Sequence, residues 1–219
     1  YTSSNATFIG YEAGEAVTTG AQNVGIGRRA LQDTTTGASN TSVGTYSMLQ
    51  NTTGGNNTVL GYYALGNNTT SNNNTAIGSQ SLHNSTGSSN VAVGYHASYT
   101  NTTGISNSSF GTYALKDNTS GNYNTALGGD IPGGTYGALS ANTTGANNVA
   151  VGTAALRSNT TASGNTAVGY RALDLNTTNA QNTAVGIQAG MNNTGAHGTF
   201  IGAYCGLNNT SGNYNTAVG

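Results

Sequence analysis

The sequence predicts an all-β protein, a parallel β-roll or β-solenoid in which one repeat of about 17 residues forms one coil. A glycine closes the phrase Asn-Thr-Ala-Val-Gly, or a variant of it, in thirteen copies, and most of these glycines lie 17 residues apart. The remaining spacings are 16, 16 and 24 residues. Thr, Gly and Asn supply 36, 34 and 32 of the 219 residues, whereas charged residues make up only 5%. A register this strict indicates stacked coils and argues against disorder.

Composition excludes several other classes of protein. The formal net charge of −1 provides no electrostatic surface for nucleic acid or for an anionic membrane. No apolar run approaches the ~18 residues of a transmembrane helix. One cysteine excludes a disulfide framework, and one proline argues against collagen. We therefore expect no nucleic-acid partner and no direct membrane insertion by this segment.

Each part of the repeat has its own pattern, which we number as slots 1 to 17 with the closing glycine at slot 5. Slots 1 to 5 alternate with period two and are rich in Thr and Val, which predicts a short strand. Slots 6 to 10 predict a second short extended segment, with a small residue at slot 8 and mostly Leu at slot 9. Slots 11 to 17 contain Asn-Thr-Thr-Gly, which is typical of turns. A helix is disfavoured because each of the frequent glycines costs roughly 1 kcal/mol in a helix.

Slot 4 is large and apolar in every copy. Parallel pairing of successive coils advances about 4.8 Å per coil, so that equal slots form columns. We predict that slot 4 is a structural core ladder, packed with slots 2, 8 and 9. It comprises Ile9, Ile26, Val43, Leu60, Ile77, Val93, Phe110, Leu127, Val151, Val168, Val185, Ile201 and Val218. Slot 3 should then point outward, and its small apolar residues suggest that a homotrimer or filament of this chain forms there.

Slot 1 is Asn in most copies, and stacked amides can hydrogen-bond along a column as they do in cross-β assemblies. The predicted Asn ladder comprises Asn23, Asn40, Asn57, Asn74, Asn90, Asn107, Asn124, Asn148, Asn165, Asn182 and Asn215. Two repeats have Phe at slot 3, and the same repeats have Gly at slot 9, which indicates volume compensation at a packed site. Gly190 also occupies slot 9, but its own repeat has no such Phe.

The strand phrases resemble those of a known family. Residues 89–94 (Ser-Asn-Val-Ala-Val-Gly) and 147–152 (Asn-Asn-Val-Ala-Val-Gly) resemble the Ser-Val-Ala-Ile-Gly head repeat of trimeric autotransporter adhesins (YadA-like). The longer repeat is similar to tail-fibre and surface-fibre shafts. The resemblance implies a left-handed, trimeric β-roll in an extracellular cell-surface appendage, although the head repeat of that family is shorter.

That resemblance implies a structural and adhesive surface fibre, in which this segment gives reach and low-affinity multivalent contact. The implied partners are further copies of the chain and host or cell-surface glycans or matrix. A phage or virion tail-fibre shaft is the alternative. We expect residues 1–219 to be one array of about 12 coils, a segment of a longer fibre, with one insertion near 129–135.

Groups capable of chemistry do not converge in the sequence. His83, His96 and His197 occupy different slots and should share no site, and Glu12 and Glu15 are the only close acidic pair. Catalytic and ligand groups must converge geometrically. We therefore predict no enzyme activity, no catalytic residues, no cofactor and no metal site.

Two patterns in the turn segment suggest further possibilities. Sequons of the form Asn-x-Thr are dense, and possible glycosylation sites are Asn51, Asn101, Asn142 and Asn176. Turn chemistry explains the same sequons without a glycan. Thr pairs at slots 13 and 14 would stack at strand spacing, which raises a second alternative function, an ice-binding β-solenoid.

Overall fold

The computed structural model describes residues 5–130, 134, 136–210 and 212–219, and the regular elements in this part of the chain are all three-residue β-strands. The chain forms two compact units, residues 1–106 and 107–219. The first unit contains β1 (Thr7–Ile9), β2 (Val24–Ile26), β3 (Thr41–Val43), β4 (Thr58–Leu60), β5 (Thr75–Ile77) and β6 (Val91–Val93). The second contains β7 (Ser108–Phe110), β8 (Thr125–Leu127), β9 (Val149–Val151), β10 (Thr166–Val168), β11 (Thr183–Val185), β12 (Thr199–Ile201) and β13 (Thr216–Val218).

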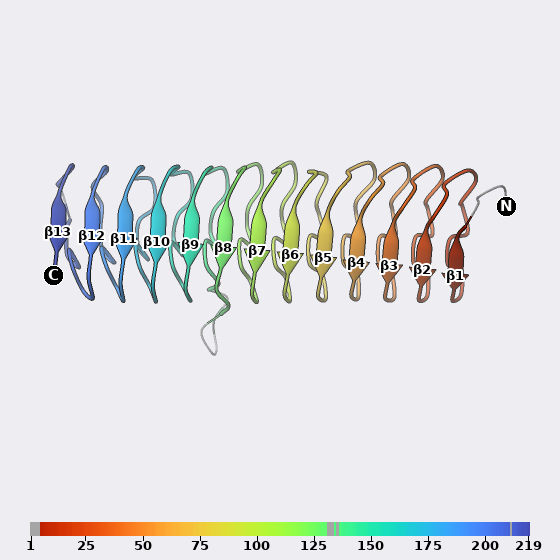
Figure 1. Ribbon diagram of the computed structural model, residues 1–219, viewed down its shortest axis with the longest axis horizontal. Coiled ribbons are helices and arrows are strands. Elements are labelled where there is room, and N and C mark those ends of the chain that lie inside the picture. The colour runs from red at the N-terminus through yellow and green to blue at the C-terminus, as the bar shows by residue number, and fades with distance from the viewer. Residues whose placement is uncertain (1–4, 131–133, 135, 211) are drawn as a thin grey trace. The chain divides into compact units, whose positions relative to one another are not determined.

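Within each unit, every strand runs parallel to the strands that precede and follow it, and residues of equal slot are paired. Ile9 pairs with Ile26, which pairs with Val43. In the second unit Val151 pairs with Val168. Figure 1 shows one strand per coil, with successive strands of a unit side by side. The predicted parallel β-solenoid, with one repeat of about 17 residues per coil, is therefore confirmed in both units.

The segment from slot 6 to slot 10 is a series of turns, so the prediction of a second extended segment was wrong. Slots 7 and 9 have positive φ angles, for example 51° at Tyr63 and 49° at Leu65. A left-handed conformation costs roughly 1–2 kcal/mol at a residue other than glycine. Leu65 is fully buried, and this burial offsets the backbone cost. Nothing in the local sequence marks a leucine for this conformation.

The interior and exterior faces of the strand are the reverse of those predicted. Slot 4 is nowhere buried: Leu60 is 50% exposed and Ile9 is 59% exposed. Slot 3 faces the interior instead, as Ala76 and Ala167 do with no exposed surface. The residues from Ile9 to Val218 that we predicted as a core ladder do form columns within each unit, but these columns lie on the outside.

The narrowness of the coil explains this reversal. At Gly25, which occupies slot 3, an added Cβ would lie only 3.3 Å from the carbonyl oxygen of Ala30 at slot 8. The strand therefore lies so close to the opposite wall that small side chains fit at slot 3, while slot 9 fills the remaining space with Leu31 and its equivalents. Slots 3 and 4 are both apolar and lie on opposite faces of the strand. The sequence pattern was therefore compatible with either slot facing the interior.

The asparagines of slot 1 lie in the interior of the coil, and ten of the eleven are buried. The exception is Asn215 in the last coil, which is exposed. The Asn40 amide nitrogen donates to Asn23 Oδ1 at 3.2 Å, and Asn57 donates to Asn40 in the same way at 3.0 Å. The backbone N–H of Asn40 also donates to Asn23 Oδ1, at 2.9 Å. One end of each coil therefore has an amide interior, and the other has an apolar one.

Glycine is required at slot 5 for two physical reasons. Gly61 has a φ of +147°, which side chains disfavour. A Cβ on Gly61 would also lie 2.4 Å from the carbonyl oxygen of Gly78 in the next coil. The repeat can thus stack at strand spacing only if this corner has no side chain.

Phe200 explains three exceptions to the repeat at once. Its ring lies against Gly206, where an added Cβ would overlap the ring, and against Gly190 of the preceding coil, where the Cβ would lie 2.7 Å from Cδ2. Gly198, which replaces Asn at slot 1, faces the far edge of the same ring, where an added Cβ would lie 2.7 Å from Cζ. The predicted volume compensation is consistent with this packing, and the unexplained Gly190 belongs to it.

The insertion predicted near 129–135 falls partly outside the described residues, which omit 131–133 and 135. Of the described residues there, Tyr136 donates its backbone N–H to Asp130 Oδ1 at 2.8 Å. Stacking resumes directly afterwards, because Leu115 donates to the carbonyl oxygen of Ala138 at 2.9 Å. The residues that follow the insertion therefore stack on the preceding coil as they do in the other repeats.

Candidate binding site

Two of the three histidines meet at one aromatic ring, contrary to the expectation that they share no site. His83 stacks on Tyr99 with ring centroids 5.4 Å apart, and His96 stacks on the same ring at 4.6 Å. His197 lies in the second unit, stacked on Tyr214 at 4.7 Å. In the described residues, no group of three or more His, Cys, Asp or Glu side chains is placed to hold a metal ion.

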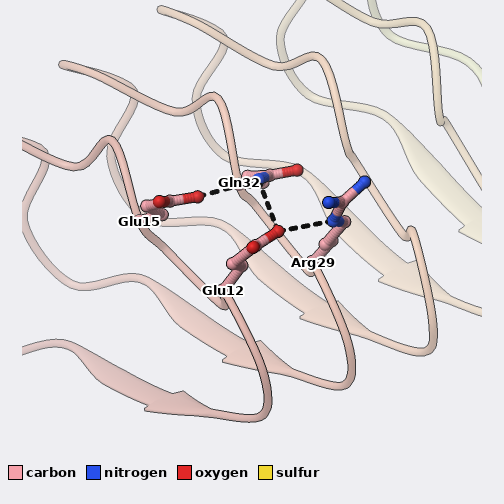
Figure 2. Close-up of polar contacts among 4 residues, drawn as sticks. All are labelled: Glu12, Glu15, Arg29 and Gln32. Atoms are coloured by element: carbon pink, nitrogen blue, oxygen red, sulfur yellow. Dashed lines mark hydrogen bonds and ion pairs between the residues drawn. The ribbon is translucent and has the colours of Figure 1, made fainter.

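The acidic pair Glu12 and Glu15 lies beside polar partners from the next coil (Figure 2). Arg29 Nε is 2.5 Å from Glu12 Oε2, and Gln32 donates to Glu12 at 3.0 Å and to Glu15 at 2.8 Å. Arg29 stands 17 residues after Glu12, and Gln32 stands 17 residues after Glu15. The repeat alone therefore places these partners together, a consequence that the search for local motifs missed.

Titration of this cluster follows from its hydrogen bonds. The pKa of Glu12 lies below its ordinary value because the Tyr11 hydroxyl and the Arg29 guanidinium both hydrogen-bond to the charged carboxylate. The same contact with Glu12 raises the pKa of Tyr11. Glu12 and Arg29 are partly exposed, and an ion pair that solvent reaches contributes little to stability. Arg29 therefore neutralises one of the two carboxylates, and Gln32 bridges both.

Asp174 is a fully buried carboxylate held by two arginines of the second unit. Arg157 Nε lies 2.7 Å from Oδ1, and Arg171 Nε lies 2.6 Å from Oδ2. The hydrogen bond to Asp174 raises the pKa of Arg171. The guanidinium of Arg157 also lies over the ring of Tyr136, 4.9 Å from its centroid. The two guanidinium groups neutralise the buried charge, although Oδ1 accepts no hydrogen bond, and we interpret the arrangement as structural.

The four sequons proposed as glycosylation sites belong to a second, buried Asn ladder at slot 12. All four asparagines are fully buried. Asn142 donates its amide nitrogen to Asn118 at 2.8 Å and to the Gly145 carbonyl at 3.0 Å, and Asn176 donates to the Asn179 carbonyl at 2.8 Å. An N-linked glycan attaches at this same nitrogen, and the interior has no room for it. Glycosylation of Asn51, Asn101, Asn142 and Asn176 is therefore incompatible with the folded chain.

Thr hydroxyls at slot 13 hold successive coils together. Thr35 Oγ1 donates to the Thr52 carbonyl at 3.1 Å, and Thr52 Oγ1 donates to the Thr69 carbonyl at 2.9 Å. The second unit repeats the contact between Thr143 and Thr160 at 3.0 Å. These hydroxyl donors are thus used in contacts between coils, which weakens the case for an ice-binding surface at this column.

The outward face of the strands is an uncharged surface of aliphatic and hydroxyl side chains. Slot 4 contributes the aliphatic columns described above, and slot 2 contributes Thr or Val beside them. Slot 6 extends the apolar surface where it is aromatic, as at Tyr11 and Tyr62, which are 64% and 50% exposed. Contiguous exposed apolar surfaces of this kind mark interaction sites.

An aromatic row crosses several coils of the first unit beside this face. Tyr46 stacks on Tyr63 with centroids 4.6 Å apart, and Tyr62 meets Tyr63 edge to face at 4.7 Å. Tyr63 in turn meets His83 at 5.6 Å, and His83 stacks on Tyr99. A hollow of about 400 Å³ opens along the row and is lined by Leu49, Gln50, Tyr62, Tyr63, Asn67, Gln80 and His83.

The fold and these surfaces define the chain as a parallel β-solenoid, with an outward apolar face and an aromatic hollow. Comparison with protein-family models, with curated proteins and with solved structures found no significant match to it. In the part of the chain that the structure describes, no helix has the length and apolarity needed to cross a membrane.

Proposed function

We propose that this chain is a shaft or head segment of a trimeric surface fibre, an adhesin-type appendage that gives reach and low-affinity, multivalent surface contact. The observation that best supports the proposal is the aliphatic column at slot 4. It repeats in register along each unit and faces solvent, so a single chain leaves it uncovered. Three copies arranged around one axis would bury it, with unbroken backbone ladders providing stiffness. A phage or virion tail-fibre shaft would use the same association.

The corrected orientation of the strand changes the surface through which we expect association. Slot 3 was predicted to face a second copy, but it is interior, and slot 4 takes its place. The face contains almost no charge, so copies do not repel one another across it. Because the coils of a unit present the same slots, two copies can match along that unit once one coil is aligned.

Lysines on this face should therefore disrupt the trimer. We expect wild-type protein to sediment as a trimer, and the Ile26→Lys/Leu60→Lys variant to dissociate at concentrations at least about tenfold higher, because like charges meet at the buried interface. Analytical ultracentrifugation measures the mass directly. The matched control is Thr36→Lys/Thr70→Lys, which adds the same charges at exposed slot 14 and should remain trimeric. A wild-type protein that stays monomeric at tens of micromolar would contradict the proposal.

A second candidate, ice binding, is favoured by one feature of the same face. Thr41, Thr58 and Thr125 at slot 2 are exposed and stand beside the slot 4 aliphatics, so hydroxyl and methyl groups alternate on a regular surface. A stable trimer would cover this array, so the two functions exclude each other. Thermal hysteresis shown by a monomer and lost in Thr58→Lys would support ice binding. Its absence in wild-type protein at millimolar concentration would exclude that function.

A further inference from the structure

One side chain is missing from a column beside the aromatic hollow. In the first unit, slot 10 contains Glu15, Gln32, Leu49, Gly66, His83 and Tyr99. Gly66 is the one glycine in this series, and the hollow lies between its neighbours in the column, Leu49 and His83. An added Cβ at Gly66 would lie 3.0 Å from His83 Nδ1 and 3.2 Å from Tyr63 Cδ1, so a side chain there would enter the space beside the rings.

Aromatic surface forms one wall of the hollow. Tyr62 is half exposed, and its ring meets Tyr63 edge to face, so the two rings present differently oriented surfaces. The face of an aromatic ring is electron-rich and attracts polarised C–H groups. A flat ligand with axial C–H bonds on one side is suited to such a wall.

Amide groups also line the hollow. Gln80 Oε1 accepts from His96 Nε2 at 2.5 Å, which leaves the Gln80 amide nitrogen as a donor. Asn67 donates to Asn84 Oδ1 at 2.7 Å. His83 Nδ1 lies 3.0 Å from the Tyr63 carbonyl, which can only accept, so the neutral ring has its proton on Nδ1. Its acceptor is then Nε2, which lies 3.5 Å from the Asn67 amide nitrogen. Donors and acceptors are therefore both fixed beside the rings.

The lining contains no Asp, Glu, Lys or Arg side chain. An ionised ligand would thus enter without a counter-charge. The volume of about 400 Å³ falls within the range of roughly 300–1,000 Å³ that small-molecule sites have. We propose that this hollow binds a neutral saccharide, with one pyranose ring stacked on Tyr62 and its hydroxyls paired with Gln50, Gln80 and His83.

This inference deepens the adhesive function proposed above by naming its ligand class and the residues that would bind it. Because the hollow is open, we expect a dissociation constant in the millimolar range for one site. Multivalent presentation along a fibre would increase the avidity. The site lies within the first unit, so a single chain is sufficient for the contact.

Saturation-transfer difference NMR on the full chain tests the proposal with three probes: cellotetraose, maltotetraose and N,N′-diacetylchitobiose. We expect transfer to the ring C–H protons of at least one probe. Gly66→Leu, which fills the hollow with the residue found at slot 10 of the preceding coil, should weaken that binding at least tenfold. The matched control Lys116→Leu places leucine at slot 10 in the second unit and should bind as wild type does.

A second variant protects the test against misfolding of Gly66→Leu. Tyr62→Ala removes a half-exposed ring and should also weaken binding at least tenfold while circular dichroism stays unchanged. Folded wild-type protein that binds none of the probes, or binding that survives both variants, would overturn the inference. A trimer without saccharide binding overturns only this inference, whereas a monomer that binds saccharide supports it and contradicts the trimer.

Discussion

Replacing Asn57 by alanine should destabilise the first unit by about 2–4 kcal/mol, because the substitution removes three hydrogen bonds from a dry interior. Asn57 Oδ1 accepts from the Asn74 backbone N–H at 2.9 Å, and its amide nitrogen donates to Asn40 Oδ1 and the Ser71 carbonyl, both at 3.0 Å. Both of these acceptors keep a second donor in the variant. The backbone N–H of residue 57 still donates to Asn40 Oδ1, and Asn68 still donates to the Ser71 carbonyl. The Asn74 N–H, however, loses its partner in a place that water does not reach, and this loss dominates the cost.

Urea denaturation followed by far-ultraviolet circular dichroism measures this effect. The matched control is Thr53→Ala in the preceding coil, which truncates an exposed side chain and should change the free energy of unfolding by less than about 0.5 kcal/mol. If Asn57→Ala were as mild as Thr53→Ala, the Asn ladder would not stabilise the coil as we describe. Hydrogen exchange at the Asn74 amide gives a local readout, and it should accelerate in the variant.

Replacing Phe200 by alanine should cost about 3–5 kcal/mol, because it empties the space between Gly190 and Gly206. Phe200 is 1% exposed and is the largest fully buried side chain. Gly206→Leu alone should also be strongly destabilising, since its Cβ would overlap the phenyl ring. Thermal or urea unfolding of each variant measures both effects.

The double variant Phe200→Ala/Gly206→Leu makes the Phe200 prediction sharper. It restores the usual pairing of alanine at slot 3 with leucine at slot 9, and Gly206 already has the positive φ of 62° that leucines adopt at this slot. We therefore expect it to be more stable than either single variant, with a coupling energy of at least about 2 kcal/mol. Additive losses in the double variant would show that the ring and the glycine are not packed together.

The sequence predicted the coil and its stacking because every repeat restates the same period. It did not predict which face of the strand is buried, since alternation defines two faces without naming the inner one. We assigned the larger aliphatic at slot 4 to the interior, as in an ordinary sheet. In a coil this narrow, the interior has room for the small Ala76 at slot 3 together with Leu82 at slot 9. The larger Ile77 at slot 4 therefore lies on the outer face.

The candidate site was predictable only in part. Column arithmetic on the 17-residue period would have placed Arg29 beside Glu12, and it would have marked Gly66 as the gap at slot 10. It would also have shown that Asn51 belongs to a second regular Asn column, at slot 12. A search for sequons alone does not compare positions between repeats and so misses this column. The volume of the hollow and the orientation of its rings depend on three-dimensional packing, which no local pattern specifies.

Distances between spin labels on slot 2 test the stacked columns most directly. Cys205 would first be replaced by serine, the residue that already occupies slot 8 at Ser47. Nitroxides would then be attached to cysteines introduced in pairs, at Thr7 and Thr75 or at Thr7 and Val91. Four and five strand spacings predict separations of about 19 and 24 Å, with the second longer by about 4.8 Å. Double electron–electron resonance on samples diluted with unlabelled chain measures both. Separations that do not increase by one strand spacing per repeat would contradict the account.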